Sequence, residues 1–141
     1  MNKVNFVENL LFFEGIDVIG INETWLIPAI ADSFLAINQY HLERSDSAEN
    51  VRKHGVAFYV RHGIKYNVVD NTPNNCIILK LIDFDLYVLN VYRPPSSSSN
   101  DNSALLEYLS TFCTDKEVIL MGDFNLPSIN WWDVSSVHGV T

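Results

Sequence analysis

The stretch from Gly55 to Tyr92 restricts the fold most, because short apolar runs alternate there with clusters of turn residues. Runs of this length, with apolar residues at a period of two, are typical of strands. The turn residues Asp83–Asp85 separate two such runs and predict an antiparallel hairpin. We therefore expect consecutive strands at Val56–Val60, Ile64–Val69, Cys76–Leu81 and Leu86–Tyr92.

A unit of one helix followed by one strand is predicted on each side of this region. Asn2–Glu14 has apolar residues at helical spacing, and Gly15 follows at the position of a helix-ending glycine. The apolar run Val18–Asn22 comes next and predicts a buried strand. Strands that follow one another between helix–strand units indicate α+β layers and argue against a purely parallel sheet.

The second unit begins with a helix capped by Asn102 or Ser103. It continues into the apolar run Val118–Met121, which predicts a strand buried on both faces. We expect the helix to turn these residues inward: Leu105, Leu106, Leu109 and Phe112.

The remaining segments show no regular periodicity. Residues 27–51 predict a long surface excursion, and Arg93–Pro95 ends its strand because proline cannot donate to a ladder. Ser96–Asn102 predicts a polar loop. Leu126–Thr141 contains Trp131 and Trp132 but no further strand of any length.

The composition fits a single packed domain, since 141 residues with a hydrophobic fraction of 48% can bury a core. The net charge of −8 does not favour a nucleic-acid binder unless a local basic face or a bound cation offsets it. Five basic residues between positions 41 and 66 predict either a phosphate-facing patch or an ordinary solvated face. They are Arg44, Arg52, Lys53, Arg61 and Lys65.

Neither cysteine has metal-ligand spacing, so we expect Cys76 and Cys113 to be reduced thiols. The sequence shows no membrane-spanning run and no targeting segment. We therefore expect a soluble chain of intracellular type that does not bind membranes; its oligomeric state is left open.

Two predicted strands end in acidic residues. Glu23 follows the first buried run, and Asp123 and Asn125 follow Gly122 after the last one. If these strands run side by side, the carboxylates meet at one edge of the sheet. Carboxylate and amide oxygens are hard ligands suited to Mg²⁺, Mn²⁺ or Ca²⁺. The alternatives are a solvated loop for Glu23 and an ordinary turn at Asp123.

Such a site would hydrolyse a phosphoester. Asp123 would orient or deprotonate the attacking water, and Asn125 would donate a hydrogen bond to the phosphate. Tyr92 ends a predicted strand, and its phenol could donate to a phosphoryl oxygen or to a leaving group. The alternative for Tyr92 is packing at the core or at the sheet edge.

Four sequence segments follow one another along the chain: Ile19–Leu26, Gly55–Val60, Leu89–Pro95 and Ile119–Asn125. This series resembles the endonuclease/exonuclease/phosphatase superfamily. More narrowly, Glu-Thr-Trp-Leu together with Tyr-Arg-Pro-Pro and Gly-Asp-Phe-Asn is similar to the endonuclease domain of non-LTR retrotransposon polyproteins.

The resemblance implies a two-layered β-sandwich flanked by helices. It implies Glu23 as the metal ligand, with Mg²⁺ or Mn²⁺ as the cofactor, and Tyr92, Asp123 and Asn125 as catalytic residues. It also implies DNA as the partner, with nicking of one strand to supply a primer for reverse transcription. A nuclear location would follow for such a retrotransposon protein.

Two family features are not matched. Family members carry an active-site asparagine on a strand upstream of the first helix and an Asp-His pair downstream. The only histidine after Asn125 is His138, which lacks that context and is not assigned the role. We therefore expect residues 1–141 to form one partial domain with impaired activity. The alternatives are an inactive remnant and a phosphatase of the same superfamily.

Overall fold

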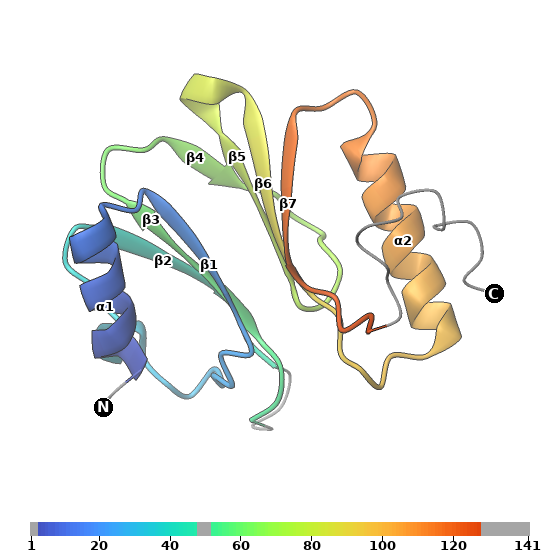
Figure 1. Cartoon of the computed structure of the whole chain (residues 1–141), viewed down its shortest axis with the longest axis horizontal. Coiled ribbons are helices and arrows are strands. Elements are labelled where there is room, and N and C mark those ends of the chain that lie inside the picture. Colours follow the sequence, from blue (N-terminus) through green and yellow to red (C-terminus); the bar gives the residue numbers. More distant parts are fainter. Residues whose placement is uncertain (1–2, 48–51, 128–141) are drawn as a thin grey trace.

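The computed structural model describes residues 3–47 and 52–127, which form two stacked sheets between two helices (Figure 1). The helices are α1 (Lys3–Glu14) and α2 (Ser99–Cys113). The strands are β1 (Val18–Asn22), β2 (Tyr40–Ser45), β3 (Val56–Arg61), β4 (Tyr66–Val68), β5 (Cys76–Leu81), β6 (Leu86–Tyr92) and β7 (Val118–Asp123). Short 3-10 turns lie at Asp32–Phe34 and Ile82–Phe84.

The first sheet has the order β1-β3-β2, and both of its pairs are antiparallel. The second sheet has the order β4-β5-β6-β7. Its β5–β6 pair is the predicted antiparallel hairpin, and β6 and β7 run parallel. A parallel pair needs a crossover connection, which α2 provides between β6 and β7. The predicted α+β sandwich flanked by helices is confirmed.

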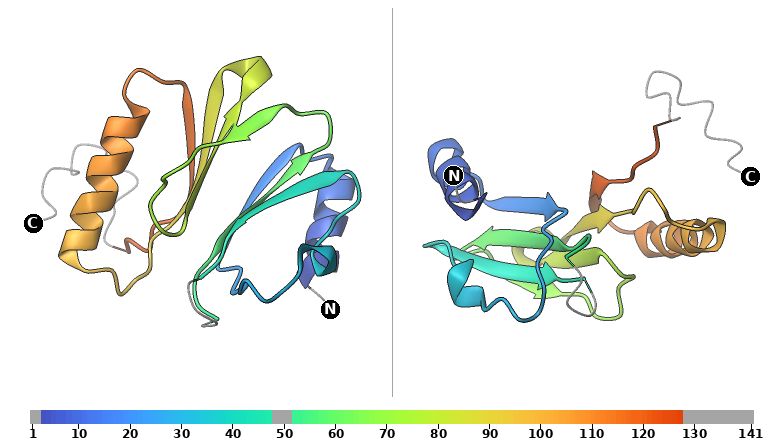
Figure 2. Two further views of the ribbon diagram at one scale, coloured as in Figure 1. Left: turned by 180° about the vertical axis from the view of Figure 1, so that it is seen from behind. Right: turned by 90° about the horizontal axis from the view of Figure 1, so that it is seen from below.

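The layers follow the order α1, first sheet, second sheet, α2 (Figure 2). The period of two along each strand produces this order, because successive side chains point to opposite faces. Along β3, Phe58 packs into the core between the sheets while Tyr59 packs with Leu11 of α1. Along β5, Leu79 joins the same core and Ile78 packs toward α2 with Leu109.

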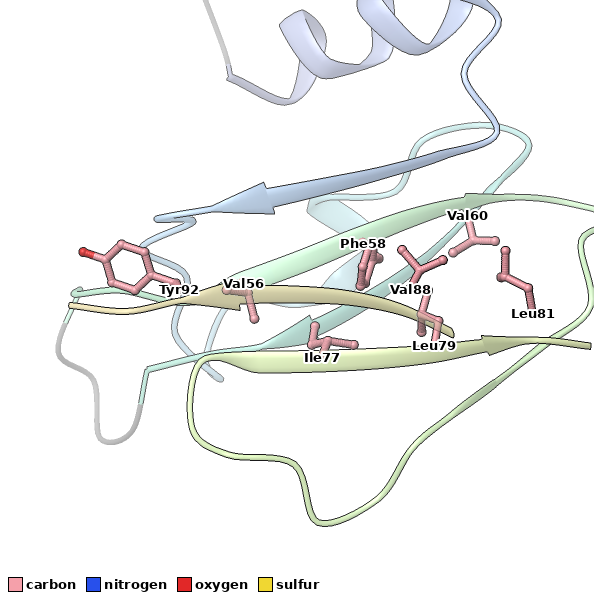
Figure 3. Packing of buried hydrophobic residues seen from close by; sticks show 8 residues of the cluster. All are labelled: Val56, Phe58, Val60, Ile77, Leu79, Leu81, Val88 and Tyr92. Carbon is pink, nitrogen blue, oxygen red and sulfur yellow. The ribbon is translucent and has the colours of Figure 1, made fainter. Parts of the chain in front are cut away.

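The core between the sheets is apolar along most of its length and ends at Tyr92 (Figure 3). One amide interrupts it. Asn90 on β6 is 1% exposed, and its Nδ2 donates to the carbonyl oxygens of Ile21 and Ala57, each at 3.1 Å. A second amide links the sheets in the opposite direction: Nδ2 of Asn22 on β1 donates to the carbonyl oxygen of Val91 on β6 at 2.8 Å. These amides join the two sheets next to the rim where β1 and β6 end.

Two predictions about local structure are wrong. Residues 27–51 are not one loop, because Tyr40–Ser45 forms β2 and pairs with β3. The polar residues of β2 hid it from a search for apolar alternation. The second helix begins earlier than Asn102, since Ser98 caps it and forms a capping box with Asp101. Much of the predicted loop at Ser96–Asn102 is therefore helical.

The predicted burial is also wrong at several positions. Ile119 and Leu120 of β7 are 47% and 44% exposed, so this strand is not buried on both faces. The residues of β1 are only half-buried. Leu106 was expected to face inward but is 61% exposed. An apolar run predicts a strand, whereas its burial depends on which layers cover each face.

The predicted strand at Ile64–Val69 is shorter, since β4 covers Tyr66–Val68. The cysteines are free thiols, Cys76 buried and Cys113 half-buried. None of the helices in residues 3–47 and 52–127 is long and apolar enough to cross a membrane.

Candidate active site

The ends of β1, β6 and β7 meet at one edge of the sandwich, which we call the rim, and Tyr92 lies there beside the two predicted acidic residues. β1 and β7 do not run side by side in one sheet, because they belong to different sheets, but the two strands contact each other across the sandwich. Tyr92 ends β6 and pairs in register with Asp123 on β7. Its hydroxyl, which points away from the apolar cluster in Figure 3, donates to Oε1 of Glu23 at 2.7 Å. Glu23 and Asp123 therefore both lie next to one tyrosine.

The surroundings of Tyr92 keep its phenol protonated. Burial, the hydrogen bond to Glu23 and the charges of Glu23 and Asp123 raise the pKa of Tyr92 to about 12, burial contributing most. Each of these effects disfavours a phenolate. Asp123, which pairs with Tyr92 along the sheet, contributes to this higher pKa through its charge. The hydroxyl of Tyr92 therefore acts as a hydrogen-bond donor, and in this structure Glu23 accepts its hydrogen bond.

Residues with positive φ shape the rim on the β1 side. Glu23 has φ 54°, Trp25 has φ 53° and His54 has φ 58°, all in the left-handed region that few side chains adopt. Two backbone bonds fix this turn, from Thr24 N to Gly55 O at 3.2 Å and from Trp25 N to His54 O at 2.9 Å. Uncommon backbone conformations of this kind gather at functional sites.

His54 is a rim residue that the sequence did not indicate. Its ring centroid lies 5.4 Å from that of Tyr92, with 35° between the planes. It precedes the strand signal at Gly55 and falls in a stretch without periodicity. The sequence shows only that His54 stands directly before a predicted strand. The pairing of β3 with β1 is what brings His54 to the rim.

Gly122 allows the β7 side of the rim to form. It has φ 147°, and a Cβ there would collide with the backbone carbonyl oxygen of Val91 on β6. After it, Oδ1 of Asp123 accepts from the backbone N–H of Asn125 at 3.0 Å. Gly122 itself lies within β7 and pairs with Val91, so the prediction that the backbone turns sharply at this glycine is wrong. The bond between the Asp123 side chain and Asn125 N–H follows directly after the strand end.

Asn125 and Arg93 hold each other in place. Nδ2 of Asn125 donates to the carbonyl oxygen of Arg93 at 2.9 Å. In return, Nη1 of Arg93 donates to the carbonyl oxygens of Phe124 and Asn125 at 3.2 and 3.1 Å. An amide nitrogen carries two hydrogens, so one hydrogen of Asn125 is left for another acceptor.

The donor set suits a hard divalent cation with few protein ligands. Within the described ranges 3–47 and 52–127, three or more His, Cys, Asp or Glu residues nowhere gather at one point. The rim instead supplies the exposed carboxylates of Glu23 and Asp123. Mg²⁺ is bound in enzymes by one or two carboxylates, its other positions being filled by water and phosphate oxygens. The residues present fit such an ion and do not fit a soft metal.

Ion pairs neutralise most of the basic residues between positions 41 and 66. Arg44 pairs with Asp32 and Asp46, and Arg61 pairs with Asp17. Lys65 lies 3.6 Å from Asp83. This pairing argues against a phosphate-facing patch at these three residues, and the largely buried Arg44 is not part of a solvated face either. Arg52 and Lys53 are exposed.

His138, Trp131 and Trp132 lie outside the described residues.

The comparisons with known proteins agree with this fold. A structure of an AP endonuclease from Archaeoglobus fulgidus matches with a TM-score of 0.62 and 19% identity, over 87% of this chain and 52% of that one. A structure of the human Nocturnin catalytic domain with a bound sulfate anion matches with a TM-score of 0.52 and 14% identity, over 94% of this chain and 61% of that one. The chain thus spans little more than half the length of either structure.

No curated protein matches the sequence. The model of the Endonuclease/Exonuclease/phosphatase family matches residues 3–136, nearly the whole chain, and the chain therefore belongs to this family.

Proposed function

We propose that the chain is the DNA-nicking endonuclease domain of a non-LTR retrotransposon protein and hydrolyses phosphodiesters with a divalent ion. The observation that carries this is the 2.7 Å bond between Tyr92 and Glu23 next to Asp123. The family unites hydrolases of phosphate esters that generally depend on a divalent metal. The AP endonuclease among the similar structures supports a nucleic-acid substrate. The Tyr-Arg-Pro-Pro segment supports the retrotransposon branch.

Each rim residue has a role in this proposal. Glu23 would hold Mg²⁺ or Mn²⁺, and the bound ion would polarise the phosphate. Asp123 orients the attacking water and accepts its proton. The Tyr92 hydroxyl exchanges its hydrogen bond to Glu23 for one to a phosphoryl oxygen or to the leaving group when substrate binds. Asn125 donates its second amide hydrogen to the phosphate.

The test is nicking of supercoiled plasmid with Mg²⁺, Mn²⁺ or EDTA, using wild type, Glu23→Gln and Asp123→Asn. We expect slow, metal-dependent nicking that falls at least about a hundredfold in either variant. The matched control is Glu43→Gln, because Glu43 also accepts a tyrosine hydrogen bond, from Tyr66 at 2.8 Å, but lies away from the rim. Equal nicking in all variants would show that the activity does not come from these residues.

Metal binding is measured separately, so that weak catalysis does not decide the question. Mn²⁺ should broaden the NMR signals of Glu23 and of Asp123, and the broadening should disappear in Glu23→Gln. Broadening without any nicking would support the inactive remnant. Hydrolysis of a small phosphomonoester in preference to plasmid would support the phosphatase.

A further inference from the structure

We propose that a pocket beside the rim, which we call the amide pocket, binds the base of an unpaired nucleotide whose phosphate lies at Tyr92. The pocket lies between the β4–β5 loop at residues 71–75, the end of β6 and the first half of α2. These segments meet at the lower edge of Figure 1. The cavity measures about 610 Å³, within the range of small-molecule sites. The inference rests on the proposed nucleic-acid substrate.

The walls offer the groups that recognise bases. Asn71 and Asn74 line the pocket, and within the described residues their side chains make no hydrogen bond. Asn102 accepts from Nε of Arg93 at 2.7 Å through Oδ1, which leaves its Nδ2 hydrogens available. Carboxamides present donors and acceptors in one plane, as the edges of bases do.

An aromatic ring forms another part of the wall. Tyr108 lines the pocket, and its ring lies parallel to that of Phe112, with 5.9 Å between centroids and 12° between planes. This contact fixes the orientation of the tyrosine. Bases that are unstacked from their neighbours commonly stack on such rings.

The loop is held in its binding shape without a ligand. The hydroxyl of Thr72 donates to the carbonyl oxygen of Cys76 at 2.9 Å, and Tyr92 N donates to Asn75 O at 2.9 Å. Asn71 and Asn75 have φ 57°, a conformation that asparagine tolerates better than most residues. A preformed site loses less entropy on binding. The bond between Asn75 and Tyr92 also ties the pocket directly to the rim.

The charges favour a neutral ligand. The charged residues that line the pocket are Arg93 and Asp101, which cancel formally. The Asp101 carboxylate is already bound by Ser98, through the backbone N–H at 3.2 Å and the hydroxyl at 2.7 Å. With one cation that is also engaged by Asn102, the pocket suits a base better than a phosphate. Tyr92 and Arg93 line the pocket and also lie at the rim, so a base in the pocket would lie next to the residues that we assign to the phosphate.

The experiment measures binding by the ¹⁵N-labelled chain in the absence of metal. Thymidine, adenosine and inorganic phosphate are titrated while side-chain amide signals are followed by NMR. We expect the nucleosides to shift Asn71 and Asn74, and phosphate to leave both unchanged. Asn74→Ala and Asn71→Gly, which keeps the positive φ accessible, should each weaken nucleoside binding about fivefold. The matched control Asn67→Ala, at an exposed position of β4, should bind like wild type.

Three outcomes would overturn the amide pocket: no nucleoside shifts, equal shifts from phosphate, or unchanged affinity in both pocket variants. The plasmid assay separates this result from the proposed function. Nucleoside binding at the pocket without metal-dependent nicking would reject the nuclease and keep the pocket. Nicking dependent on Glu23, with no nucleoside response, would reject the pocket alone.

Discussion

Replacing Glu23 by glutamine tests whether its carboxylate controls the ionisation of Tyr92. The pKa of Tyr92 lies at about 12, roughly two units above an ordinary tyrosine, and burial is the largest cause. Glutamine still accepts the phenol hydrogen bond but carries no charge. We expect the pKa of Tyr92 to fall by about half a unit to one unit. It should stay above 10 because burial and the charge of Asp123 remain.

The measurement is an alkaline NMR titration with tyrosine labelled at ¹³Cζ, which resolves individual phenols. Glu43→Gln is the matched control, since it removes the charge from the carboxylate that accepts the Tyr66 hydrogen bond. That control should lower the pKa of Tyr66, which burial and Glu43 raise, and leave Tyr92 unchanged. The contact between Glu23 and Tyr92 would be refuted if the pKa of Tyr92 did not change in Glu23→Gln, or if it fell equally in Glu23→Gln and in Glu43→Gln.

The same pKa predicts how stability changes with pH. A tyrosine whose folded pKa is raised stabilises the folded state fully below its unfolded pKa of about 10. That contribution is lost as the pH rises from about 10 through the folded value of about 12. Because Glu23→Gln lowers the folded value, the variant should lose less stability over this range than wild type. Urea unfolding at pH 8 and pH 11 measures the difference, and a larger loss in the variant would contradict it.

Three further experiments test the packing of the fold. Gly122→Ala should lower the free energy of unfolding by about 3 kcal/mol or more, because the new Cβ meets the backbone of β6. Gly63→Ala, at a glycine with positive φ but open space around it, should lower it by about 1 kcal/mol. Equal losses of stability in urea unfolding would refute the steric argument. Asn90→Leu should cost about 2 kcal/mol, because two hydrogen bonds between the sheets are lost and their carbonyls stay buried; an unchanged unfolding midpoint would contradict this. Iodoacetamide at pH 8 should label Cys113 in the folded chain but not Cys76. Cys76 is buried, and burial raises the pKa of its thiol to about 12. Mass spectrometry after digestion shows which cysteine reacts, and both should react in urea.

The local elements could be predicted from the sequence where the signals of neighbouring residues agree. The hairpin of β5 and β6 was predictable because apolar alternation and turn residues agree there. The place of Asp123 at a strand end was also predictable, since the apolar run that forms β7 leads directly to it. β2 was missed because its partner strand, and not its own composition, makes it a strand. The Ser98 cap was missed because several polar residues in a row could have served.

The residue types of the candidate site could be predicted from the sequence, since Glu23, Tyr92 and Asp123 each come at the end of a recognisable apolar run. Their arrangement could not. The sequence suggested two strands side by side, whereas the tertiary structure placed β1 and β7 in different sheets and brought their ends together around Tyr92. Local propensity and periodicity act over a few residues, so they determine which side chains stand at a strand end. Which strand ends meet depends on how two sheets pack face to face, and only the contacts between distant segments decide that.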